Sequence, residues 1–205
     1  MFADRLYISP HYNPEDYTIL NLRVDSPEKD WNRAIDIFQD RIYGRFFNAI
    51  DILLNETRRF PTDGIDFSFS AMALMCLLIE TLHQFYNGID ETEWRRHKDA
   101  FIYFLTGSAR FRPYFGVREA QLFYSHIRNG IIHQAQTKRN TQLTISSTRM
   151  VDIIPRGIRI DVMLFYTVLR DEVYDYINRL HNPDEHSIRE RFISKMNYIV
   201  RDTLN

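Results

Sequence analysis

The sequence predicts a mainly all-α fold, a bundle of about five or six helices with a small β excursion after residue 140. Three observations predict it. Glycine and proline, which interrupt helices, number only seven each among 205 residues, while aromatic residues make up 14%. Apolar residues recur at three- and four-residue steps through most of the chain, which is the period of one helix face. Short alternating runs replace that period only after Thr137.

Composition narrows the class of protein. Hydrophobic residues make up 44% and charged residues 26%, which excludes a mainly disordered chain. With 26 basic and 27 acidic residues, the net charge of −1 excludes a surface that is basic throughout, but not a local basic patch. The single cysteine, Cys76, excludes an internal disulfide and a multi-cysteine zinc site. We find no targeting signal, and the most apolar stretch, residues 71–79, is far shorter than the roughly 20 residues that cross a bilayer. We therefore expect a soluble cytoplasmic protein that does not associate with membranes.

The first element with a clear signal follows an N-terminal arm. Residues 1–24 lack a sustained period and predict an irregular or weakly stranded arm, whereas residues 25–205 predict a single helical domain. The segment 25–28, Asp-Ser-Pro-Glu, is typical of a helix start, with a polar cap and a proline in the first turn. The helix after it runs to about Asn55. Its apolar face is expected to pack on the chain's own core, or alternatively to form a dimer seam; this face comprises Trp31, Ile35, Phe38, Ile42, Phe46, Ala49 and Leu53.

The middle of the chain predicts three further helices. The first, over 69–86, carries one charge, Glu80, so we expect it to be buried on most sides. Asp90 and Glu93 have the spacing of a capping box for the next helix, which ends near Leu105. After a loop at 107–116, a fourth helix presents an apolar face made of Val117, Ala120, Phe123, Tyr124, Ile127 and Ile131.

The last third predicts the β excursion, over about 141–160, and two closing helices. Residues 143–145, 151–154 and 158–160 have the composition of short strands, and Pro-Arg-Gly at 155–157 is a turn. Asp161 then caps one helix, and the polar run at 182–185 caps the other.

One segment departs from the balanced charge of the whole. Between residues 106 and 140 the only acid is Glu119, against six basic residues: Arg110, Arg112, Arg118, Arg128, Lys138 and Arg139. Such an excess predicts a site for a phosphate-bearing ligand such as RNA or a nucleotide, although a solvated face has the same composition.

Arg128 and His133 lie within this basic segment and have side chains suited to phosphate chemistry. A guanidinium grips two phosphate oxygens at once, and an imidazole exchanges protons near neutral pH. On a straight helix the two side chains would point about 140° apart. Gly130, a poor helix former, predicts a local distortion between them.

Glu80 is the second candidate. A carboxylate on an apolar helix must pair, protonate or face water, and Arg128 is its natural partner, either as a structural bridge or as part of a site. The other histidines do not predict a metal site. His126 and His133 lie two turns apart, about 10.8 Å, too far to share one ion. His11 and His97 have no sequence neighbours that suggest ligation. We expect neither a metal nor another cofactor.

Several segments together resemble the HEPN superfamily, and most closely a bacterial branch found near mobile or defence genes. The resemblance covers about residues 30–180 and depends on Phe69–Leu82, Phe85, Phe104–Leu105, Ala120, Phe123–Tyr124 and Arg128–Gln134. It implies a bundle of four or five helices, usually dimeric. In many such families the Arg-x4–6-His motifs of two subunits meet in a cleft that cuts RNA without metal.

On that pattern Arg128 and His133 match the functional positions, and Asn129 matches the polar residue that often follows the arginine. Ala135 stands where a tyrosine would mark the version modified by a paired nucleotidyltransferase, so that version is not matched. Some relatives also carry cysteine at the position of Asn129.

These observations lead to one main hypothesis and two alternatives. The main hypothesis is a metal-independent endoribonuclease, a toxin or defence effector that acts as a homodimer and has RNA and an antitoxin or regulatory protein as partners. The first alternative is a non-catalytic HEPN module that binds nucleotide, RNA or a protein through the same cleft. The second is a dimeric scaffold that uses the aromatic-rich helix at 31–54 and leaves Arg128 locked to Glu80 and inaccessible.

Overall fold

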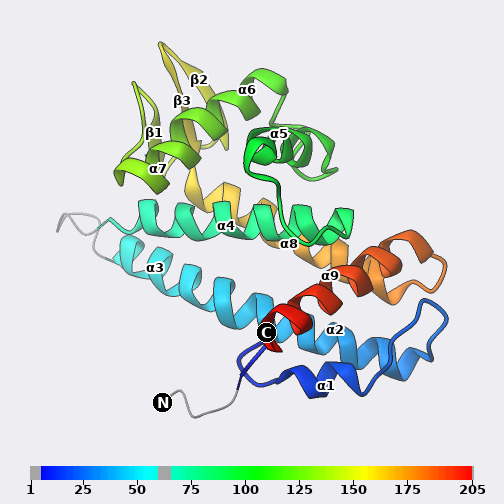
Figure 1. The fold of residues 1–205 in the computed structure, drawn as a ribbon. Coiled ribbons are helices and arrows are strands. Elements are labelled where there is room, and N and C mark those ends of the chain that lie inside the picture. The colour runs from blue at the N-terminus through cyan, green and yellow to red at the C-terminus, as the bar shows by residue number, and fades with distance from the viewer. Residues whose placement is uncertain (1–5, 60–65, 205) are drawn as a thin grey trace. The chain divides into compact units, whose positions relative to one another are not determined.

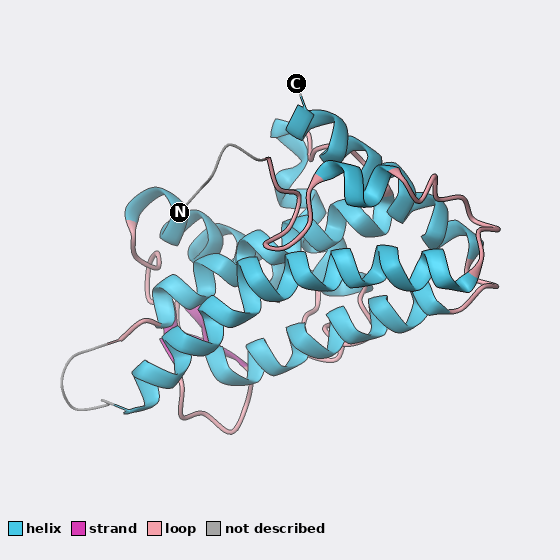
Figure 2. Ribbon diagram, turned by 90° about the horizontal axis from the view of Figure 1, so that it is seen from below, coloured by secondary structure: helices cyan, strands magenta, loops and turns pink. Residues whose placement is uncertain are grey.

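The computed structural model describes residues 6–59 and 66–204, and it is mainly helical with one small sheet, as the sequence predicts (Figures 1 and 2). When consecutive helical elements are counted as one segment, six long helical segments lie within these described ranges, together with the short helix α1. They span residues 28–59, 68–87, 94–107, 117–134, 162–181 and 186–204. In chain order the elements are α1 (Pro14–Thr18), α2 (Glu28–Ile42), η1 (Tyr43–Phe47), α3 (Asn48–Arg59), α4 (Ser68–Asn87), η2 (Trp94–Arg96), α5 (His97–Gly107), α6 (Val117–Leu122), η3 (Phe123–Arg128), α7 (Asn129–Gln134), β1 (Gln142–Thr144), β2 (Val151–Ile154), β3 (Gly157–Asp161), α8 (Val162–His181) and α9 (His186–Leu204).

The chain divides into two compact units. Unit 1 comprises Met1–Asn48, Gln84–Glu91 and Tyr174–Asn205, and unit 2 comprises Ala49–His83 and Thr92–Val173. Helices α4 and α8 each contribute residues to both units. The Arg128 segment, the sheet and Glu80 all belong to unit 2.

The N-terminal arm is partly helical, so the expectation of an irregular or weakly stranded arm is wrong for residues 14–18, which form α1. The physical reason is a local capping box: the Asn13 side chain accepts from the Asp16 amide, and the Asp16 side chain accepts from the Asn13 amide. Tyr17 on this helix is only 3% exposed, which anchors the arm in the core of unit 1.

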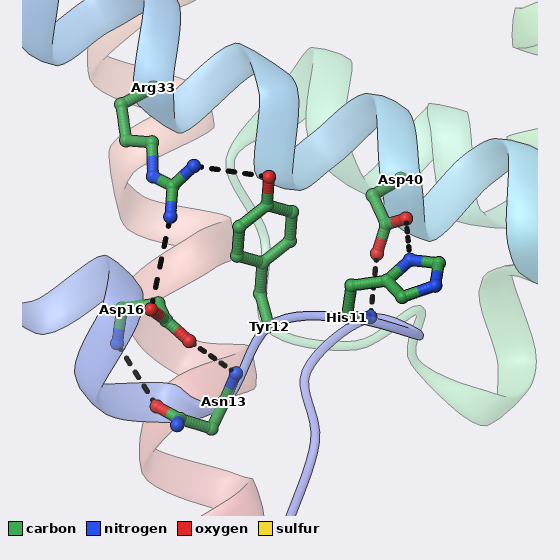
Figure 3. Close-up of polar contacts among 6 residues, drawn as sticks. All are labelled: His11, Tyr12, Asn13, Asp16, Arg33 and Asp40. Atoms are coloured by element: carbon green, nitrogen blue, oxygen red, sulfur yellow. Dashed lines mark hydrogen bonds and ion pairs between the residues drawn. The ribbon is translucent and has the colours of Figure 1, made fainter.

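Polar contacts also hold the arm to α2 (Figure 3). The His11 ring lies 2.7 Å from Asp40 Oδ1, and the His11 amide donates to Asp40 Oδ2. Arg33 donates to the Tyr12 hydroxyl at 3.1 Å and lies 3.9 Å from Asp16. The sequence offered no partner for His11, because Asp40 is 29 residues away along the chain.

Helix α2 begins at Glu28, within the predicted start, but the expected polar cap does not form: Pro27 is the N-cap residue and no side chain caps the helix. The apolar face of α2 is buried in unit 1. Trp31 and Phe38 are at most 1% exposed, and both rings contact Phe192 of α9. This face therefore packs on the chain's own core, and it is not available as a dimer seam. The π-helical stretch η1 then changes the register. Beyond it the buried residues are Phe47, Ile50 and Leu54, each one position later than the expected Phe46, Ala49 and Leu53, because a π turn holds one extra residue.

In unit 2 the residues of α4 form a core helix. Among the described residues, α4 is the one helix long and apolar enough to cross a membrane by length and composition, and half of its most apolar window is buried inside the protein. A core helix of a soluble protein passes the same test, so the finding is weak evidence for a membrane span. The core beside it is aromatic, with the Phe123 and Phe165 rings stacked at 5.1 Å and Phe111 at 5.1 Å from Phe165.

The expected capping box at Asp90 and Glu93 does not form. The helix α5 begins only at His97, after the short 3-10 turn η2, and no side chain caps it. Asp90 instead pairs with Arg201 in unit 1, at 3.1 Å, and Glu93 pairs with Arg96 at 3.2 Å. A distant arginine thus competes successfully for the carboxylate that local spacing assigns to a cap.

The β excursion forms where it is predicted. Its three strands lie in the order β1-β3-β2, with β1 parallel and β2 antiparallel to β3. Ile158 and Ile160 on β3 are fully buried. Asp161 ends the sheet and caps α8, since its Oδ1 accepts from the Leu164 amide at 2.9 Å.

Candidate functional site

The Arg128–His133 segment begins inside a distorted helix. Arg128 is the last residue of the π-helical stretch η3, and α7 follows from Asn129 to Gln134. The sequence predicts a distortion between Arg128 and His133, and this prediction is wrong: the π-helical stretch ends at Arg128, and the residues from Asn129 to Gln134 are regular α-helix. Gly130 serves another purpose: an added Cβ would lie 2.4 Å from the Gln136 carbonyl oxygen and 3.2 Å from the Lys138 amide nitrogen. Only glycine allows the loop after α7 to fold back this closely.

The guanidinium of Arg128 is mostly buried and contacts groups on three sides. Its Nη2 lies 3.4 Å from Glu80 Oε2, and its Nη1 donates to Asn129 Oδ1 at 3.2 Å. The rings of Phe101 and Tyr124 lie 5.9 and 5.6 Å from its central carbon, within cation–π range. The structure thus forms the predicted pair with Glu80 and makes Asn129 a direct support.

One atom of this guanidinium remains unsatisfied. The Nε of Arg128 is buried and has no hydrogen-bond acceptor among the described residues. Leaving a buried donor without an acceptor costs about 1–3 kcal/mol. Because Nε is buried, a ligand oxygen could remove that cost only if the groups that cover Nε moved.

Glu80 also contacts a histidine that sequence reasoning missed. Nδ1 of His97 lies 2.8 Å from Glu80 Oε1, and this is an ion pair when the imidazole is protonated. Both side chains are largely covered, at 20% and 15% exposed. The sequence carried no local signal for this contact, because it depends on how α5 packs beside α4.

His133 has a different environment from Arg128. It lies in the last turn of α7 and is exposed, as are its neighbours Ile132 and Gln134. No hydrogen bond or ion pair joins Arg128 to His133 among the residues that the structure describes. A single chain therefore presents a held guanidinium and an exposed imidazole, but does not bring them together.

Two further titratable groups near the site are poor candidates for proton transfer. His126 is buried, its Nδ1 lies 3.1 Å from Thr141 Oγ1, and burial together with the charges of Arg139 and Lys138 lowers its pKa. Burial raises the pKa of the Cys76 thiol to about 12. His126 is therefore kept neutral, and Cys76 is kept as a thiol.

The other predicted phosphate-binding residues lie on three separate segments. Arg110 and Arg112 are on the exposed turn between α5 and α6, and Arg118 is in the first turn of α6. Lys138 and Arg139 lie on the loop between α7 and β1. Of these, Lys138 is fixed closest to the Arg128 segment, because its amide donates to the His126 carbonyl oxygen at 2.8 Å.

The side chains available for chemistry at this site are the guanidinium of Arg128, the carboxylate of Glu80 and the imidazoles of His97 and His133. Within the described ranges, no three His, Cys, Asp or Glu side chains are grouped closely enough to hold a metal ion. The arrangement favours binding an anion at Arg128 and exchanging a proton at an exposed histidine. No protein-family model, no curated protein and no solved structure matches this chain.

Proposed function

We propose that this protein is a metal-independent endoribonuclease of HEPN type, acting as a homodimer and serving as a toxin or defence effector. The observation that carries the proposal is Arg128, a guanidinium fixed by Glu80 and Asn129 at the end of a π-helical stretch, five residues before an exposed histidine. Single π turns are rare, and they occur often at functional sites.

Arg128 is suited to stabilise charge on a phosphodiester. It is anchored before any ligand arrives, and its buried Nε still lacks an acceptor. A preorganised donor of this kind contributes most where charge develops in the transition state.

His133 supplies the proton transfer. RNA carries its own nucleophile, so the base has only to remove the proton of the 2′-hydroxyl. The 2′-oxygen bonds to phosphorus, the bond from phosphorus to the 5′-oxygen breaks, and an acid returns a proton to that leaving oxygen. The products are a 2′,3′-cyclic phosphate and a 5′-hydroxyl. A positioned histidine contributes roughly 10²–10⁴-fold in either role.

Two chains are needed because one chain holds only half of this arrangement. In each chain Arg128 is mostly covered while His133 is exposed, so a second copy would supply the second histidine. Exposed apolar side chains in unit 2 support self-association: Ile132 is 42% exposed, Leu77 49% and Tyr103 65%.

The test is cleavage by purified protein in EDTA. Wild-type protein is expected to cut single-stranded RNA and to leave 2′,3′-cyclic phosphate ends, identified by mass spectrometry. His133→Ala is expected to lose at least 100-fold in kcat. The matched control is His186→Ala, since His186 is also exposed but lies at the start of α9 in unit 1. The proposal fails if no RNA is cut in EDTA and His133→Ala also leaves the growth of expressing cells unchanged.

A second candidate function is a non-catalytic module that binds RNA, nucleotide or a protein partner. The contact between Arg128 and Glu80 favours it, because this carboxylate competes with any phosphate for the guanidinium. Binding needs Arg128 but not His133. If Arg128→Met abolishes RNA binding while wild type and His133→Ala bind RNA equally and cut none, the module is the correct function.

A further inference from the structure

Two turns of unit 2 are fastened side by side at one end of the small sheet. One is the loop between α7 and β1, and the other is the turn between β2 and β3. Asn140 of the first donates from its side-chain amide to the Pro155 carbonyl oxygen of the second, at 3.0 Å. Gly157 permits this approach, because an added Cβ would lie 2.8 Å from the Asn140 carbonyl carbon and 2.9 Å from the Thr141 nitrogen.

Each turn carries an arginine at its tip. Arg139 has φ 57° and Arg156 has φ 67°, both in the left-handed region that reverses the chain direction. The two arginines, with Asn140 and Pro155, line an open cavity of about 740 Å³. Cavities of roughly 300–1,000 Å³ are typical of small-molecule sites.

The charge facing this cavity is positive and uncompensated. None of the four lining residues is acidic, and neither Arg139 nor Arg156 forms an ion pair with a described residue. The nearest acids along the chain are engaged elsewhere: Asp152 pairs with Arg149 at 3.1 Å, and Asp161 accepts two backbone amides.

The positive potential also extends inward. Besides burial, the charges of Arg139 and Lys138 lower the pKa of His126, a buried histidine on the neighbouring π-helical stretch. Lys138 and Arg139 thus keep an effective positive charge at the place where the loop meets the helix.

We propose that Arg139 and Arg156 hold a phosphate group between the two turns, with Asn140 as the residue that fixes their spacing. Two guanidiniums that line one cavity can both donate to the oxygens of a phosphate or phosphodiester. The inference rests on the proposed function only for the source of that phosphate, which is the backbone of an RNA strand. A free phosphate or nucleotide has the same chemistry, so the experiment separates the two sources.

The experiment compares Arg139→Gln and Arg156→Gln with wild type. Arg149→Gln is the matched control, because Arg149 is an exposed arginine of the same region that does not line the cavity. Binding of a fluorescent 12-nucleotide RNA is measured by anisotropy at several salt concentrations, and binding of inorganic pyrophosphate by calorimetry. Equal melting temperatures verify that all variants fold.

Each cavity variant is expected to lose about 5–10-fold in RNA affinity, while the control stays within twofold. The slope of log K against log salt concentration should fall by about 0.7 for each phosphate contact removed. Loss of pyrophosphate binding with unchanged RNA binding would support the phosphate site and assign it to a small ligand. Unchanged binding of both probes, or an equal loss in Arg149→Gln, would overturn the inference.

The same variants separate this inference from the proposed ribonuclease. If the chain cleaves RNA, the cavity variants should raise KM and leave kcat unchanged, whereas His133→Ala lowers kcat. If wild type cuts no RNA but the cavity variants still lose RNA affinity, the phosphate site stands and the nuclease proposal fails.

Discussion

Gly130→Ala tests the most specific backbone constraint of the site. The new methyl group would lie 2.4 Å from the Gln136 carbonyl oxygen, about 1 Å inside ordinary van der Waals contact, so the loop at 136–138 must move. Overpacking of this kind costs about 1–3 kcal/mol. The movement also weakens the hydrogen bond from the Lys138 amide to the His126 carbonyl oxygen, which contributes about 1 kcal/mol.

A gain in helix propensity opposes these losses. Alanine is favoured over glycine by about 1 kcal/mol inside a helix. The net effect is therefore a fall of about 2 kcal/mol in the free energy of unfolding. For a chain of this length, that lowers the melting temperature by about 4–8 °C.

Gly107→Ala is the control for the propensity gain alone. Gly107 is the last residue of α5, and an added Cβ there meets no atom within 4 Å. We expect this variant to melt at or slightly above the wild-type temperature. Calorimetry of the three proteins, with hydrogen exchange at the Lys138 amide, measures both the global and the local effect. If Gly130→Ala melts within about 1 °C of Gly107→Ala and protects Lys138 equally, the close approach is not a constraint.

Three further predictions concern charged and buried groups. Glu80→Gln leaves the covered Arg128 guanidinium without its anion, and urea titration should show a loss of about 2–3 kcal/mol, below the range for fully buried pairs because both side chains keep some solvent contact. Burial works to raise the pKa of Asp40, but hydrogen bonds from His11 and Ser9 hold it below its ordinary value of 3.8. The contribution of Asp40 to stability is therefore present above pH 3.8 and is lost as the pH falls through the lower folded-state pKa, and His11→Ala should flatten this acid dependence. Cys76, with its pKa raised to about 12, should react with thiol reagents only after unfolding.

A specific result would contradict each of these three predictions. A Glu80→Gln variant as stable as wild type would mean that solvent already screens the pair with Arg128. An acid unfolding curve unchanged by His11→Ala would mean that Asp40 does not depend on the imidazole. Thiol modification faster than global unfolding would mean that Cys76 becomes exposed through local opening.

Helix positions were predictable where the signal is local. The Asp-Ser-Pro-Glu run marks the start of α2, although no side chain caps that helix. Asp161 caps α8 as expected, because a cap depends on residues three or four positions apart. The capping box at Asp90 failed because Arg201, far along the chain, pairs with that carboxylate. Local spacing determines which side chains could cap a helix, and tertiary contacts determine which of them actually do so.

In the candidate site, too, some contacts were predictable from the sequence and others depend on the tertiary fold. The pairing of Arg128 with Glu80 was predictable, since a buried carboxylate and a nearby guanidinium have few other ways to be satisfied. The contact of His97 with Glu80 and the position of Arg156 beside Arg139 were not, because both depend on chain reversals whose geometry no local pattern encodes. The π turns were also not predictable, since the apolar period is the same before and after a π turn and only the buried face shifts by one residue.

One backbone hydrogen bond connects the Arg128 segment to the loop that carries Arg139. Arg128 ends the π-helical stretch, and the His126 carbonyl oxygen in that stretch accepts from the Lys138 amide, next to Arg139. A change that displaces the π-helical stretch should therefore alter both the guanidinium at Glu80 and the arginine at the cavity, whereas Arg156→Gln affects the cavity alone. If Gly130→Ala weakens RNA binding as much as Arg139→Gln does while Arg128 stays paired with Glu80, the loop, rather than the helix, determines how the strand is held.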